Sequence, residues 1–140
     1  MDDTRALPAR PTADWRSYRA EEAAELAAGT LDPAEAYLAE LFPDSMLAAT
    51  DLVLAAFEQE AAAWGAAPAD VRVLGAVERV VLALNAVNEE HDGAAYETDE
   101  RERLCAYIDE VLIAAGIEVG ALAARQGLGR HEITDAWRDW

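Results

Sequence analysis

Hydrophobic residues recur every three or four positions along most of the chain, which is the period of amphipathic helices. The stripe between residues 70 and 90 is broad enough to indicate contact on more than one side, so we expect this helix at the centre of a bundle. Each run lies between polar or Gly/Pro-containing segments, which set its approximate bounds. The pattern predicts helices over residues 12–28, 33–42 and 98–115. It also predicts one from Asp44 or Ser45 to about Trp64 and one from near Pro68 or Asp70 to about Glu90.

Local signals mark the ends of these helices. Thr12 is predicted to cap the first helix, and Gly29 is a suitable residue to stop it. Asp32, followed by a proline, is the clearest start signal in the chain, and Pro43 ends the helix that it begins. Thr98 is predicted to cap the fifth helix, whose first turn carries acidic residues that suit the helix dipole.

The two ends of the chain carry weaker patterns. Residues 1–11 contain two prolines and no apolar period, so we predict a flexible tail there and a single all-helical domain over residues 12–140. Glycines at positions 120, 127 and 129 interrupt the last stretch. Within it we expect short helical pieces near residues 121–126 and 132–140.

Composition supports an all-α fold. The 140 residues are about one domain's worth, 53% are hydrophobic, and 33 are alanines, which favours helices packed closely side by side. No apolar run approaches the roughly 20 residues that cross a bilayer, and the acidic start lacks the pattern of a secretory signal. The single cysteine, Cys105, cannot form an internal disulfide. We therefore expect a cytoplasmic protein with no membrane contact.

The charge balance is the strongest functional signal. The chain has 28 acidic residues against 11 arginines and no lysine, for a formal net charge of −17. Such a field repels nucleic acid and anionic membranes and attracts cationic partners. The simpler alternative is that the acidity only keeps an alanine-rich bundle soluble.

An acidic segment joins the predicted fourth and fifth helices. Carboxylates there surround an aromatic residue that we expect to be exposed, and such a rim is a plausible docking surface for a basic protein. The alternative is an ordinary solvated loop before a well-capped helix. The predicted partner-binding residues are Glu89, Glu90, Asp92, Tyr96, Glu97, Asp99 and Glu100.

The same segment partly follows the pattern of a helix–loop–helix calcium site. With Asn88 as position 1, Glu90, Asp92 and Asp99 fall at positions 3, 5 and 12, and Gly93 falls at position 6. Position 1 is usually Asp and position 12 a bidentate Glu, so the match is poor in detail. We assign no metal ligand, and a divalent-metal-binding bundle remains an alternative.

A segment near the C-terminus resembles the core of a helix-turn-helix. Ala123, Gly127 and Ile133 match the packing positions of that family, and Arg130 and His131 would lie near a phosphate backbone. The resemblance implies DNA binding. Acidic residues in the expected recognition helix and the net charge of −17 oppose that role, so nucleic acid is not the expected partner.

Signals of catalysis or of a cofactor are weak. The two histidines, His91 and His131, are far apart in the sequence, and Cys105 lies on or beside the apolar face of its helix. No phosphate loop or helical histidine pair occurs. We therefore expect a non-enzymatic inhibitor or immunity-type protein, without a cofactor, that masks a basic partner such as a toxin or nuclease. The alternatives are the DNA-binding and metal-binding proteins above and a homo-oligomeric helical bundle.

Overall fold

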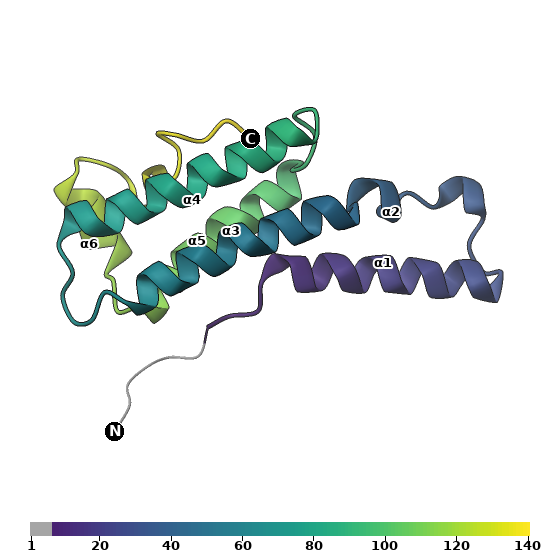
Figure 1. The fold of residues 1–140 in the computed structure, drawn as a ribbon, viewed down its shortest axis with the longest axis horizontal. Coiled ribbons are helices and arrows are strands. Elements are labelled where there is room, and N and C mark those ends of the chain that lie inside the picture. Colours follow the sequence, from purple (N-terminus) through teal and green to yellow (C-terminus); the bar gives the residue numbers. More distant parts are fainter. Residues whose placement is uncertain (1–6) are drawn as a thin grey trace, which may run out of the picture.

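Over residues 7–140, six α-helices and two 3₁₀ turns make up an all-α bundle (Figure 1), which confirms the predicted fold class. The computed structural model describes residues 7–140, and no strand occurs among them. The elements are α1 (Pro11–Ala28), η1 (Pro33–Glu35), α2 (Leu38–Leu41), α3 (Asp44–Ala62), α4 (Asp70–Glu90), α5 (Thr98–Ala114), α6 (Val119–Arg125) and η2 (Arg130–Ile133).

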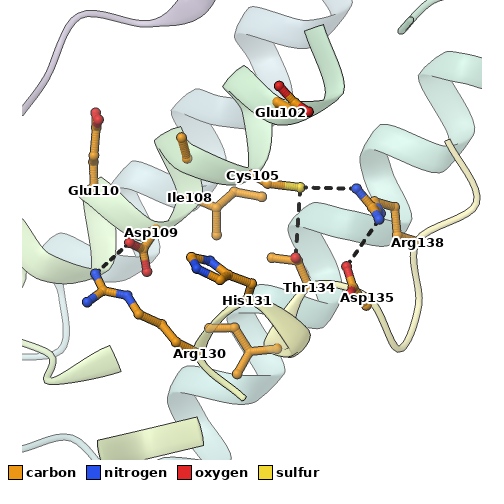
Figure 2. A pocket seen from close by; sticks show the side chains of 12 residues that line it. Glu102, Cys105, Ile108, Asp109, Glu110, Arg130, His131, Thr134, Asp135 and Arg138 are labelled. Carbon is orange, nitrogen blue, oxygen red and sulfur yellow. Dashed lines mark hydrogen bonds and ion pairs between the residues drawn. The ribbon is translucent and has the colours of Figure 1, made fainter. Parts of the chain in front are cut away.

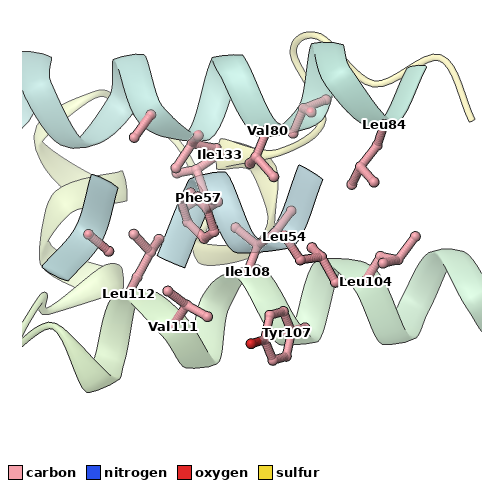
Figure 3. Close-up of a cluster of buried hydrophobic side chains, with 14 of the residues drawn as sticks. Leu54, Phe57, Val80, Leu84, Leu104, Tyr107, Ile108, Val111, Leu112 and Ile133 are labelled. Atoms are coloured by element: carbon pink, nitrogen blue, oxygen red, sulfur yellow. The ribbon is translucent and has the colours of Figure 1, made fainter. Parts of the chain in front are cut away.

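The core lies between α3, α4 and α5 (Figure 3). Phe57 of α3 faces Val80 of α4 and Ile108 of α5, and all three side chains are buried. Burying one such side chain stabilises the fold by about 1.5–3 kcal/mol. The helices are therefore held together mainly by their apolar faces, as the periodicity predicts.

Helix α3 lies between α1 and α4 and also packs against α5 (Figure 1). The prediction that α4 occupies the centre is wrong. Its broad apolar stripe faces the core that it shares with α3 and α5, and the C-terminal segment covers a further side, where the indole of Trp140 reaches Val81. Val71, counted in that stripe, is 79% exposed.

Helix α1 starts one residue before the predicted cap, with Pro11 in its first turn. The hydroxyl of Thr12 does not cap the helix, because it donates to Asp51 Oδ1 at 2.6 Å. Gly29 closes the helix in the left-handed conformation (φ 74°), as predicted. Of the predicted tail, residues 1–6 lie outside the described range, and Arg10 is fixed by two hydrogen bonds of 2.8 Å to Glu58.

The helix predicted over residues 33–42 is interrupted. Asp32 accepts a hydrogen bond from the backbone N–H of Ala34, as expected for a cap, but the turn that it starts ends at Glu35. The chain is extended at Ala36, and the buried Glu22 carboxylate of α1 then accepts the backbone N–H groups of residues 37 and 38. A side chain distant in sequence therefore starts α2, and no local signal could reveal it.

The helix predicted over residues 132–140 does not form beyond η2. Asn85 of α4 binds this segment on both sides of its amide: its Nδ2 donates to the carbonyl of Trp137 at 2.7 Å, and its Oδ1 accepts the backbone N–H of Asp139 at 2.9 Å. Trp140 is buried, and its indole N–H points to the carbonyl of Val81 at 3.4 Å. Contacts with α4 thus replace the helical hydrogen bonds.

Within residues 7–140, no helix is long and apolar enough to cross a membrane.

Candidate functional site

The predicted partner-binding residues surround the turn between α4 and α5. The carbonyl of Asn88 accepts the backbone N–H groups of His91 and Gly93 at 3.1 and 2.8 Å, which ends α4. Asp92 and Gly93 both have positive φ, at 60° and 72°. Glycine adopts this conformation freely and Asp tolerates it better than most residues, so the sequence fits a tight reversal here.

Side-chain contacts hold this turn against the start of α3. Nδ1 of His91 lies 2.9 Å from the carbonyl oxygen of Val87, so it must carry the proton and donate. In the neutral imidazole, Nε2 then accepts from the Ser45 hydroxyl at 3.0 Å. The turn is thus tied both to its own helix and to a neighbouring one, which limits its freedom to move.

Tyr96 is buried, and the prediction that it is an exposed docking residue is wrong. Its side chain is only 6% exposed, and its hydroxyl lies 2.6 Å from that of Thr50. Its ring packs against Trp15 and Trp140. Burial raises the pKa of this phenol to about 12. Tyr96 therefore anchors the turn to the core and cannot contact a partner in this conformation.

Glu100 is also buried, so it is not part of the exposed rim that we predicted. Its carboxylate accepts the backbone N–H of Glu97 at 3.3 Å, which satisfies a group at the start of α5. Burial raises the pKa of Glu100 above its ordinary value. The cap of α5 is thus Glu97, with Glu100 bonding back to it, rather than Thr98 as predicted.

Five of the seven predicted residues remain on the surface, and they form what we call the acidic turn. None of the five takes part in an ion pair within residues 7–140. In the described part of the chain, eight arginines form ion pairs, all with other carboxylates. The acidic turn consists of Glu89, Glu90, Asp92, Glu97 and Asp99.

The calcium-site pattern is not matched by the geometry. Asn88, its first position, is buried and uses its side-chain oxygen to accept the backbone N–H of Ala95 at 3.0 Å. Among the described residues, no group of three His, Cys, Asp or Glu side chains is arranged to hold a metal ion. The Asn88 side chain, which would be the first ligand of a calcium loop, instead holds the backbone of the turn at Ala95.

A hollow of about 490 Å³ lies between α5 and η2 (Figure 2). Thr134 and Arg138 donate to Cys105 Sγ at 3.8 and 3.5 Å. Arg138 pairs with Asp135 and Arg130 with Asp109, so both guanidinium groups that line the hollow are neutralised. The thiol therefore lies at the edge of the core, and neither of these arginines is free to select an anionic ligand.

Comparison with models of protein families, with curated proteins and with solved structures found no match.

The residues expected to form a helix-turn-helix are arranged differently. Ala123 and Ile133 are buried, as packing residues would be, but residues 130–133 form a 3₁₀ turn and residues 134–140 form no α-helix. The second helix, which would enter a DNA groove, is therefore missing from this segment. Arg130 is paired with Asp109 rather than free to contact a phosphate.

The hollow at Cys105 was missed by sequence reasoning, and so was the contact between His91 and Ser45. Both depend on segments far apart in the chain: 46 residues separate His91 from Ser45, and 33 separate Cys105 from Arg138. Neither contact leaves a signal within a few residues of sequence.

Proposed function

We propose that this chain is a non-enzymatic interaction module that binds a basic protein through its acidic turn. In its most concrete form it is an inhibitor or immunity-type protein that covers the cationic active surface of a toxin or nuclease. The observation that carries this proposal is the set of five exposed carboxylates around one turn, none of them paired with an arginine in the described part of the chain.

Unpaired carboxylates suit such a role for an energetic reason. A carboxylate already held by an internal arginine must lose that ion pair before it can bind a partner's lysine or arginine. The acidic turn carries no such cost, and its negative field speeds the encounter with a cationic surface. The pairs formed on binding would then be weakened by salt.

The rigidity of the turn supports the same role. Asn88 accepts the backbone N–H of Ala95, His91 contacts Ser45, and Tyr96 packs in the core. A surface that is ordered before binding loses less conformational entropy in the complex. The buried aromatic residue therefore contributes by fixing the carboxylates in place, and the partner meets the charges directly.

The proposal is tested by affinity capture. The chain is immobilised, exposed to a lysate of its source cells at low salt, and eluted with a salt gradient. We expect one basic protein to be released as the salt concentration rises, and we expect its activity to disappear when the chain is added back. Recovery of no protein, or only of further copies of the chain, contradicts the proposal.

A further inference from the structure

An apolar groove of about 510 Å³ runs between α3 and α4 on their outer side. Leu52 lines it and is 75% exposed, although removing a leucine side chain from water lowers the free energy. The ion pair between Glu60 and Arg79 lies at one end and crosses from one helix to the other. The apolar lining residues are Leu52, Val53, Ala56, Phe57, Val80 and Ala83.

The acidic turn lies beyond the other end of the groove, along the same side of α4. Positions 79, 83, 86 and 90 fall on one row of α4, because they are separated by steps of three or four residues. Arg79 and Ala83 line the groove, so Ala86 and Glu90, both exposed, continue the same side toward the end of the helix. The contact between Ser45 and His91 shows that the start of α3 lies beside the end of α4 there.

We propose that this groove and the acidic turn form one docking surface for a cationic amphipathic helix of the partner. The inference rests on the function proposed above and names the element that is bound. The apolar side of such a helix would cover Leu52 and the alanines of the groove, while its lysines or arginines would face Glu89, Glu90 and Asp92. Alanines let a second helix approach closely, within the usual 8–10 Å between packed helix axes.

Charge selects this occupant over a second copy of the chain. The chain has a formal net charge of −17, and the carboxylates of the acidic turn, which lies beyond one end of the groove, pair with no arginine in the described residues. A second copy would bring a like-charged surface close to this one, which is unfavourable. An amphipathic helix with basic residues complements both the apolar groove and the acidic turn.

The test uses two synthetic peptides of about 18 residues, five helical turns. Both contain only leucine and lysine in equal proportions. In one peptide the leucines recur with the helical period, and in the other the same residues are permuted so that no apolar face forms. Binding to the whole chain is measured by fluorescence anisotropy at roughly 50 mM salt, where exposed charges interact strongly.

Two double variants separate the groove from general hydrophobicity. Leu52→Gln with Ala56→Gln alters two exposed positions that line the groove, and Val71→Gln with Ala62→Gln makes matched changes at exposed positions that do not line it. We expect the amphipathic peptide to bind about tenfold more tightly than the permuted one, a difference of about 1.4 kcal/mol. That advantage should disappear in the groove variant and persist in the control.

Three results would overturn the inference. Equal binding of both peptides, sensitive only to charge reversal in the acidic turn, would leave the proposed function standing without the groove. Failure of both peptides to bind would remove the proposed function as well. A dimer in sedimentation measurements that the groove variant dissociates would show that a second copy occupies the groove.

Discussion

The indole ring of Trp140 meets the phenol ring of Tyr96 edge-on, with the ring centroids 5.7 Å apart. Tyr96 also faces Trp15 of α1, and its hydroxyl contacts Thr50 of α3. The C-terminal segment, the α4–α5 turn and two helices therefore meet at one residue. The acidic turn is positioned by the core because its aromatic residue is part of that core.

Replacing Trp140 with alanine should destabilise the fold and loosen the turn. The expected loss is about 3 kcal/mol, at the lower end for a buried tryptophan, because the surrounding segment has no helix of its own and can relax. Urea unfolding measures the loss, and hydrogen exchange at the Ala95 amide reports on the turn. Trp137→Ala, at a half-buried position, is the control and should cost less. An unchanged exchange rate at the Ala95 amide would show that the C-terminal segment does not hold the turn in place.

Glu22→Ala should release the start of α2. The carboxylate accepts the backbone N–H groups of Tyr37 and Leu38, and loss of a helix cap costs about 1 kcal/mol. Hydrogen exchange should accelerate at these two amides while those of α4 stay protected. Glu22→Gln keeps one accepting oxygen and should have a smaller effect. If these two amides exchange at the same rate in Glu22→Ala and Glu22→Gln, the carboxylate does not start this helix.

Stability in acid should depend on Glu58. Burial raises its pKa, but hydrogen bonds from Arg10 and Tyr107 outweigh this and hold the pKa below its ordinary value. Its stabilising contribution is therefore present above the unfolded-state pKa of about 4.3 and is lost as the pH falls through the lower pKa of the folded state.

A comparison of the wild type with Glu58→Gln measures that contribution. Urea midpoints should differ most at neutral pH, and the difference should shrink as the pH falls through the range below about 4. Tyr18→Phe changes a phenol outside this network and should give the wild-type pH dependence. A difference that stays constant at every pH would show that the ion pair does not control acid stability.

Added salt should stabilise the folded chain. The net charge of −17 produces self-repulsion, and raising NaCl from roughly 20 to 300 mM shortens the distance over which charges act. The melting temperature should therefore rise.

Calcium should raise the melting temperature no more than magnesium does at the same concentration, because no carboxylate cluster is arranged to hold an ion in the described residues. A saturable shift with calcium alone would show a specific site.

The elements whose signals are local could be predicted from the sequence. Helix α4 begins at Asp70, one of the two predicted starts, and ends at Glu90, and Gly29 closes α1 in the expected left-handed conformation. Capping, glycine freedom and apolar periodicity all act within a few residues, so the sequence displays them directly. The predicted all-α class follows from these signals alone.

The predictions that failed depend on contacts between distant segments. Tyr96 lies among acidic residues in sequence, but Thr50 and Trp140 surround it in space. Glu22 starts α2 by accepting the backbone N–H of Tyr37, 15 residues away. Hydrogen bonds to Asn85 take the place of those in the helix expected near Trp137. Polar neighbours in the sequence therefore do not indicate whether an aromatic residue is buried. Two of the seven predicted site residues, Tyr96 and Glu100, are buried.

The central claim is that the acidic turn, and not the net charge alone, recognises the partner. It is tested by capture of the basic protein with two triple variants that change the net charge equally. One is Glu89→Lys, Glu90→Lys and Asp92→Lys; the other is Glu21→Lys, Glu25→Lys and Glu35→Lys, three exposed positions at the far end of α1 and in η1.

We expect the first variant to lose the partner and the second to retain it, with the helicity and melting temperature of both close to those of the wild type. Equal losses in the two variants, or retention by the first, would contradict recognition by the acidic turn.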